Sequence, residues 1–224
     1  MKIQHLETNS FDYVDKTTDD IQVWRNVRII DTNVSQAIFA DGSYCKGSSL
    51  GKDVLLNRGS LILNSVIGDK SQIGFNTKVL HAEIGKYCSI SWDCSIGGPN
   101  HNMKTLSTFN MRHQNHYKDN SCIIGNDVWM GSGAIMLRGI SVGDGAVVGG
   151  GSVLTHSVLP FEIVAGVPAR HLGWRFGENI RRRLNEIKWW NFPEEVIKKH
   201  LDLFDGEVTP VLLDKLENIS KTIL

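Results

Sequence analysis

The feature that most constrains this chain is a repeat of six residues. From Ile124 the sequence reads IGNDVW, MGSGAI, MLRGIS, VGDGAV, VGGGSV, LTHSVL, and glycine stands second in four of these six blocks. A period of six fits neither an α-helix nor a simple alternating strand, and it favours short strands joined by turns. The first position is aliphatic and the fifth is small or β-branched, so each block has two inward positions. Stacked coils of such strands would pair at a spacing of about 4.8 Å.

A looser array precedes these blocks, with starts at Leu50, Ile67, Ile73, Ile84 and Ile90. One step of six shortens to five before Ile67 and another before Ile84, which fits a corner that is one residue shorter. The repeats also account for 22 glycines in 224 residues, above the usual share of roughly 7%. We expect Gly, Asn or Asp wherever a turn requires positive φ. The sequence thus predicts a mainly β protein, a parallel β-helix.

Two segments depart from the period. Between Gly97 and Cys122 it breaks for roughly 25 residues, a length that is usually functional or disordered within a compact array. Because this insertion contains apolar residues, we expect an ordered excursion that leans on the β-helix or on a neighbouring subunit. The expected organisation is an N-terminal cap segment over 1–35, a β-helix over 36–168 with an inserted loop over 97–122, and a C-terminal helical tail over 169–224.

Helical spacing of apolar residues predicts three helices in the tail. They span 177–190, 193–204 and 210–221. The basic run Arg181–Arg183 fits a solvated helix face better than a ligand site.

Charge and composition exclude several classes of protein. The 24 basic residues balance 24 acidic ones, which argues against nucleic-acid binding driven by an excess of positive charge. No run approaches the ~20 apolar residues of a membrane span, and the N-terminal residues lack the apolar core of a secretory signal. Four cysteines without CxxC spacing indicate reduced thiols, so a cytoplasmic protein that binds neither membrane nor nucleic acid is expected.

Four stretches resemble the hexapeptide-repeat acyltransferases, and within them the xenobiotic acetyltransferase branch, which includes chloramphenicol and streptogramin acetyltransferases. The stretches are NHNMKTLSTF at 100–109, the repeats at 124–155, AGVPAR at 165–170, and RF with IKWWNFP between 175 and 193. The resemblance implies a left-handed β-helix, a homotrimer, and direct acetyl transfer from acetyl-CoA in a ternary complex. Lys104 stands where the antibiotic-modifying members carry Asp, so the acceptor stays open between an antibiotic-like xenobiotic and a sugar hydroxyl of polysaccharide assembly.

His101 is the candidate catalytic residue. It lies in the inserted loop, and histidine is partly neutral near pH 7, so it can accept a proton. The residues around it match those around the family's catalytic histidine. We therefore expect His101 to be the general base that deprotonates the acceptor hydroxyl.

Five residues are expected to bind acetyl-CoA. Trp129 follows an inward Val128, so it should point outward, where a flat apolar surface can pack on pantetheine. The resemblance to sugar acetyltransferases places cofactor contacts near Ser132, Gly150 and Thr155. Arg170 is the expected partner of a phosphate, because a guanidinium forks well onto phosphate oxygens.

Two other readings compete. His101, His113 and His116 could supply three metal ligands, as in a γ-class carbonic-anhydrase-like enzyme on the same fold, although we expect no metal. A non-catalytic hexapeptide scaffold is the second alternative. Cys88 and Cys94 occupy inward fifth positions, which predicts core packing and not nucleophilic chemistry.

Overall fold

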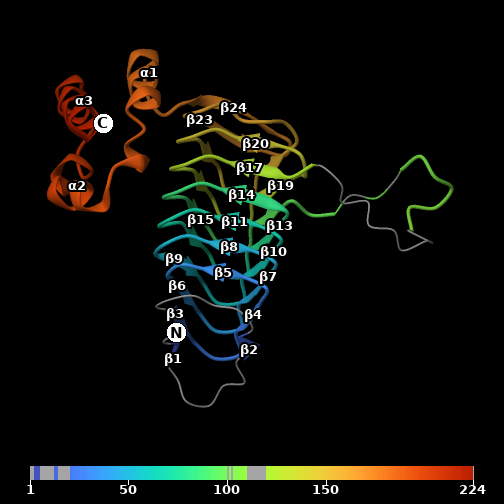
Figure 1. The fold of residues 1–224 in the computed structure, drawn as a ribbon. Coiled ribbons are helices and arrows are strands. Elements are labelled where there is room, and N and C mark those ends of the chain that lie inside the picture. Colours follow the sequence, from blue (N-terminus) through green and yellow to red (C-terminus); the bar gives the residue numbers. More distant parts are fainter. Residues whose placement is uncertain are drawn as a thin grey trace. The chain divides into compact units, whose positions relative to one another are not determined.

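The computed structural model describes residues 3–5, 13–14, 21–99, 101, 103–109 and 120–223 (Figure 1). They form two compact units, residues 1–173 and residues 174–224. The first unit holds the repeats and the inserted loop, and the second holds the helices. Within these described ranges, no helix is long and apolar enough to cross a membrane.

Three sheets build the first unit. One sheet has the strand order β1 (Ile3–His5), β3 (Ile21–Val23), β6 (Ala37–Phe39), β9 (Val54–Leu56), β12 (Gln72–Ile73), β15 (Ser89–Ile90), β18 (Trp129–Met130), β21 (Val147–Val148), β23 (Glu162–Gly166) and β24 (Ala169–Trp174). The second sheet contains β2 (Tyr13–Val14), β4 (Arg28–Ile30), β7 (Tyr44–Lys46), β10 (Leu61–Leu63), β13 (Lys78–Leu80), β16 (Ser95–Ile96), β19 (Ile135–Met136) and β22 (Val153–Leu154). The third contains β20 (Ser141–Val142), β17 (Cys122–Ile124), β14 (Ala82–Ile84), β11 (Val66–Ile67), β8 (Ser49–Leu50) and β5 (Asn33–Val34).

The chain visits the three sheets in turn, so consecutive strands form one coil and each coil pairs in parallel with the next. The register advances by one coil at each pairing, as in Ser89 opposite Trp129 and Trp129 opposite Val147. Figure 1 shows the resulting stack of coils, a parallel β-solenoid of about eight turns. The predicted fold class is confirmed, and its left-handedness stays a prediction.

Two buried side chains per six-residue block fill the interior, as the repeat predicts. Cys88 and Ile90 face inward from one coil, and Ala134 and Met136 from a neighbouring coil, each side chain being almost fully buried. The first member of each pair is small and the second is larger. This alternation fits a narrow interior, because every coil must fill the same cross-section at native packing density.

The turns carry positive φ at Gly, Asn or Asp, as expected, for example at Asp127 and Gly133. The glycines that follow the aliphatic positions have a different role, which is close packing. A Cβ on Gly68 would lie 2.7 Å from the carbonyl carbon of Gly85, and one on Gly74 would lie 2.5 Å from that of Ser91. Neither glycine has positive φ. The left-handed conformation falls on the fourth residue of the block instead, for example on Asp93 (φ 55°). The second glycine is therefore required because the next coil's backbone passes where a side chain would be.

The shortened steps lie where the chain turns from the second sheet to the third. Asn64 (φ 48°) makes this corner between β10 and β11, and His81 (φ 49°) makes it between β13 and β14. The predicted corner with one residue fewer is confirmed at both places.

Residues 21–34 form a regular coil of β3, β4 and β5, where the sequence suggested part of an irregular cap. The inward positions Val23, Ile29 and Val34 are buried like those of later coils. The step from Ile29 to Val34 is five residues long, and so is the step from Val34 to Phe39. Two short corners in succession conceal the six-residue period.

The second unit contains α1 (Glu178–Ile187), η1 (Trp189–Asn191), α2 (Glu194–Lys199), η2 (Leu201–Leu203) and α3 (Pro210–Ile223). The helix predicted over 193–204 is thus divided into α2 and η2. Helix α1 is capped at its C-terminal end by Lys188, which adopts the left-handed conformation with φ 48°. Leu184, Ile187 and Trp190 are buried, as are Leu213 and Leu216 of α3.

Candidate active site

His101 lies in the inserted loop between β16 and β17, and its side chain is exposed. Its Nδ1 is 2.8 Å from the carbonyl oxygen of Thr108. A carbonyl oxygen only accepts hydrogen bonds, so Nδ1 carries the hydrogen and donates it. In the neutral ring Nε2 then holds the lone pair. This arrangement leaves Nε2 as the nitrogen of the neutral ring that can accept a proton.

The root of the loop is fixed to the coils. Gly97 (φ 71°) is the residue where the chain leaves the second sheet, and its N–H donates to Met136 O at 3.0 Å. The guanidinium Nη2 of Arg138 donates to the Gly97 carbonyl at 3.2 Å. On the returning side, the Cys122 thiol donates to Leu137 O at 3.4 Å. Both ends of the loop are therefore held by the same turn, the one that follows β19.

The described apolar residues of the loop, Met103, Leu106 and Phe109, are exposed. Leu106 is fully exposed at 108%, and Met103 and Phe109 are also largely accessible. Figure 1 shows this described segment of the loop projecting away from the coils. These described residues are therefore not buried against the β-helix. Contact with a neighbouring subunit stays a prediction.

Trp129, Ser132 and Gly150 belong to two successive coils. Trp129 is on β18 and points outward with 55% of its surface exposed, which confirms its predicted orientation. Ser132 lies in the turn after β18, and Gly150 in the turn after β21. Because Gly151 N donates to Ser132 O at 2.8 Å, these two turns stack at one corner. The Ser132 hydroxyl also shares a 2.8 Å hydrogen bond with that of Ser91.

The other two predicted cofactor residues lie elsewhere on the same unit. Thr155 follows β22 at the next corner of the Gly150 coil, and its Oγ1 is 2.9 Å from Nδ1 of His156. Arg170 lies on β24, is exposed, and donates from Nη1 to the Ala169 carbonyl at 3.1 Å. Nearby on this strand, Nδ1 of His171 is 2.8 Å from a Glu162 carboxylate oxygen. The structure thus joins Ser132 and Gly150 at one corner, and it places Thr155 and Arg170 apart from that corner.

The alternative hypothesis of a metal site rests on three histidines, of which the structure describes only His101. His113 and His116 lie outside the described residues. Among the residues that are described, no group of three or more His, Cys, Asp or Glu side chains is placed to hold a metal ion.

The cysteines are packing residues. Cys88 and Cys94 are buried, as predicted from their fifth positions. Burial raises the pKa of the Cys88 thiol to about 12 and raises that of Cys94 as well. A thiol with so high a pKa is protonated at neutral pH and is a poor nucleophile. An acyl-cysteine intermediate on either residue is therefore unfavourable.

One surface feature was not singled out by sequence reasoning. Phe75 and Trp92 pack edge to face on the outside of the coils, with ring centroids 5.5 Å apart and an interplanar angle of 73°. Both stand third in their blocks, IGFNTK and ISWDCS. A comparison of third positions along the repeat could have found them, because they follow one another at the same corner.

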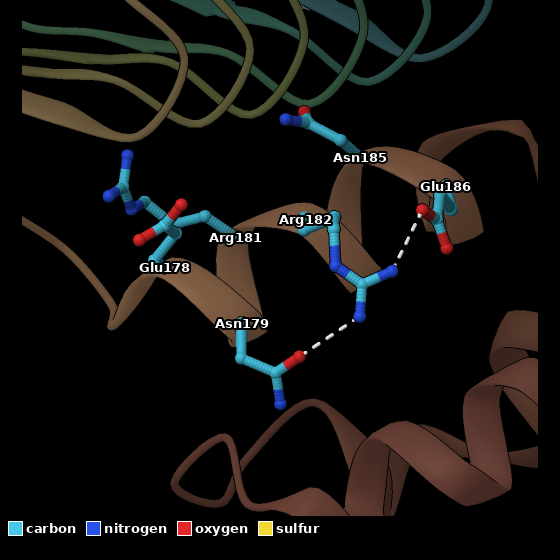
Figure 2. Close-up of a pocket in the computed structure, with 6 residues that line it drawn as sticks. All are labelled: Glu178, Asn179, Arg181, Arg182, Asn185 and Glu186. Carbon is cyan, nitrogen blue, oxygen red and sulfur yellow. Dashed lines mark hydrogen bonds and ion pairs between the residues drawn. The ribbon is translucent and has the colours of Figure 1, made fainter.

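The helical unit has an open hollow along α1. It is lined by Glu178, Asn179, Arg181, Arg182, Asn185 and Glu186 (Figure 2). Figure 2 shows Arg182 between Asn179 and Glu186, to which it donates at 3.1 and 3.3 Å. Arg182 and Glu186 are paired within the helix, and none of the predicted site residues lines this hollow.

The prediction of a solvated face for the basic run is wrong for two of its three residues. The Arg181 guanidinium lies 3.8 Å from the ring centre of Trp174, a cation–π contact. Arg183 is only 13% exposed and is bonded at 2.6 Å to both Asp214 and Glu217. These arginines hold the helical unit together.

Comparison with known proteins connects this geometry to a family. A hexapeptide-repeat model of succinyl-transferases matches residues 122–156, and a GlmU-like C-terminal hexapeptide model matches residues 16–115. A probable macrolide acetyltransferase of Lysinibacillus sphaericus is 30% identical over 139 residues, which are 55% of this chain and 77% of that protein. The chain belongs to the hexapeptide-repeat superfamily, in its xenobiotic acetyltransferase branch.

Relatives within this branch cover the chain only in part. A chloramphenicol acetyltransferase of Agrobacterium fabrum is 36% identical over 134 residues, 54% of this chain and 64% of that protein. The chain therefore spans less than two thirds of the length of that relative. A crystal structure of a point mutant of AntD, an N-acyltransferase from Bacillus cereus in complex with dTDP and coenzyme A, has a TM-score of 0.53 at 21% identity. The alignment with this structure covers 63% of the present chain and 80% of the AntD chain, and it supports the hexapeptide fold alone.

Proposed function

We propose that this xenobiotic acetyltransferase relative is an acetyl-CoA-dependent O-acetyltransferase with His101 as its general base. The observation that carries the proposal is the Nδ1 contact of His101 with Thr108 O at 2.8 Å. That contact fixes the tautomer whose Nε2 can accept a proton. The names of the relatives supply the reaction class, acetyl transfer.

In the proposed reaction, Nε2 of His101 takes the proton of the acceptor hydroxyl while the oxygen of that hydroxyl attacks the thioester carbonyl. The new C–O bond forms as the C–S bond breaks, and the thiolate of coenzyme A leaves. The imidazolium then returns its proton to that sulfur, so the products are an acetyl ester and free coenzyme A. A general base of this kind contributes about 10²–10⁴ in rate.

The donor is assigned to the row of coils that carries Trp129, Ser132 and Gly150. Gly150 is exposed and has no side chain, so an extended pantetheine can approach its backbone closely. The Trp129 indole, on the strand that precedes the Ser132 turn, offers a flat apolar surface. Thr155 and the Arg170 guanidinium complete the assignment, with Arg170 toward a phosphate of the donor.

A homotrimer is part of the proposal. The exposed loop side chains Met103, Leu106 and Phe109 are those expected to contact a neighbouring subunit. A closed symmetric assembly would bring each loop to a second copy. Analytical ultracentrifugation of the purified protein tests this directly, and a monomer at micromolar concentration would contradict it.

The acceptor is proposed as a small molecule with a free hydroxyl, either an antibiotic-like xenobiotic or a sugar. The experiment is a screen in which the purified protein, acetyl-CoA and one acceptor at a time are monitored for thiol release. Chloramphenicol, a streptogramin, a macrolide and galactosides form the panel, and mass spectrometry identifies the acetylated product. Release of coenzyme A with formation of an ester supports the proposal. Failure of the protein to bind acetyl-CoA would contradict it.

A further inference from the structure

Phe75 and Trp92 form an exposed aromatic pair on the repeat unit. Trp92 is 56% exposed and Phe75 is 38% exposed, although their rings touch. The edge contact fixes the orientation of the indole while leaving much of its surface to solvent. A large exposed aromatic surface of this kind is more informative than a single scattered apolar residue, because aromatic rings supply much of the contact energy in binding sites.

Backbone hydrogen bonds place this pair in line with the proposed donor site. Asp93 N donates to Phe75 O, Gly133 N to Trp92 O, and Gly151 N to Ser132 O, each at 2.8 Å. The same contact therefore repeats from coil to coil at one corner. Along this corner the third residues of successive blocks are Phe75, Trp92, Ser132 and Gly150. Neighbours in the row are one coil apart, about 4.8 Å.

The chemical character of this corner changes along the row. On the coils before Phe75, Arg58 and Asp41 form an ion pair at 3.4 Å. The aromatic pair follows, and next to it the Ser132 hydroxyl is bonded to that of Ser91. An apolar platform thus adjoins a pair of hydroxyl groups. This combination is typical of small-molecule sites, where apolar area supplies affinity and a few polar groups fix orientation.

We propose that Trp92, held edge-on by Phe75, is the acceptor subsite and stacks on a flat apolar face of the acceptor. The inference rests on the proposed function, because it takes Ser132 and Gly150 as the donor side. An acceptor stacked on Trp92 would lie one coil from the Ser132 turn, next to the proposed donor side. The substrate class is a hydroxyl compound with a flat apolar face, which is either an aromatic ring or the apolar face of a pyranose.

The two sources of a flat face are separated by two probes, chloramphenicol for the arene and a methyl galactoside for the pyranose. Titration calorimetry on protein loaded with coenzyme A measures the binding of each probe. This readout does not need turnover, so it tests the subsite even if the proposed reaction fails. The variants are Trp92→Ala and Trp92→Phe, and the matched control is Val66→Ala. Val66 is similarly exposed, at 48%, but lies on β11 of the third sheet.

We expect Trp92→Ala to weaken the probe that binds by about tenfold, the loss of roughly one aromatic stacking contact. Trp92→Phe should recover most of the affinity, and Val66→Ala should leave it within about twofold. The Kd for coenzyme A, measured by the same calorimetry, should stay within about twofold in all three variants. Unchanged affinity for both probes in Trp92→Ala would overturn the proposal. If Trp92→Ala weakened acetyl-CoA binding as much as it weakened probe binding, Trp92 would be a donor contact and the proposal would be overturned. A change in the mass of the oligomer, with unchanged affinity for the probes, would also overturn it.

Discussion

The coil stack and the inserted loop are built on opposite principles. In the stack each six-residue block buries two side chains, and Ile124 is 2% exposed. In the loop Leu106 is fully exposed, and the described segment is held mainly at its root, by Gly97 and Arg138. The stack is therefore held by its own packing. The loop that carries His101 is held by the stack only at its root, where the chain leaves the coils. Stability is expected to depend on the first region and chemistry on the second.

The largest expected effect is in the core of the stack. Ile124→Ala should lower the free energy of unfolding by about 2–5 kcal/mol, because it leaves a cavity between coils. Leu106→Ala should change it by less than about 0.5 kcal/mol, as for other exposed sites. Urea unfolding followed by circular dichroism measures both. A loss of several kcal/mol in Leu106→Ala would break the comparison and show that the loop is packed in the assembled protein.

Glycine offers a second contrast between the regions. Gly68→Ala should cost about 1–3 kcal/mol, because the new Cβ would lie 2.7 Å from the backbone of Gly85. Gly98→Ala should be close to neutral, since nothing lies within 4 Å of a Cβ there and φ is not positive. The same unfolding experiment compares the two variants. Equal stabilities would contradict the role assigned to the second glycine of each block.

The root of the loop should give a smaller effect on stability and a local effect on dynamics. Arg138→Gln removes the guanidinium bond to the Gly97 carbonyl, which is worth about 1 kcal/mol. Hydrogen exchange should accelerate in residues 97–122 more than in the neighbouring coils. Uniform acceleration over the whole stack would show that Arg138 supports the coils and not the loop.

The smallest effect is expected in the helical unit and depends on pH. Arg183 lowers the pKa of the Glu217 carboxyl by hydrogen bonding and charge. A lowered pKa in the folded state contributes stability above the unfolded value of about 4.3, and this contribution is lost as the pH falls through the lowered pKa. Arg183→Gln should therefore reduce the melting temperature at pH 6 more than at pH 3. Arg182→Gln, on the exposed side of the same helix, is the control, and an identical pH profile for both variants would contradict this assignment.

Sequence periodicity predicted the coils, their short corners and the inward cysteines, because each block repeats the same burial. It failed where two short corners follow one another before Phe39, and it did not show that the second glycine is required for space, because that requirement comes from the backbone of the next coil. The exposed orientation of Trp129 followed from its position after an inward residue. The pairing of Phe75 with Trp92 did not follow from the six-residue period, because these two residues are 17 apart in the sequence and meet only when successive coils stack. The Thr108 contact of His101 lies in a non-periodic loop, where spacing carries no information.

The central claim is that the exposed loop supplies the general base. The most direct test is steady-state turnover of acetyl-CoA with an accepted hydroxyl compound by wild type, His101→Ala and the control His200→Ala in the helical unit. We predict that His101→Ala lowers kcat by at least ~10²-fold while the Kd for coenzyme A stays within about twofold, and that His200→Ala retains turnover. Unchanged turnover in His101→Ala would contradict the account.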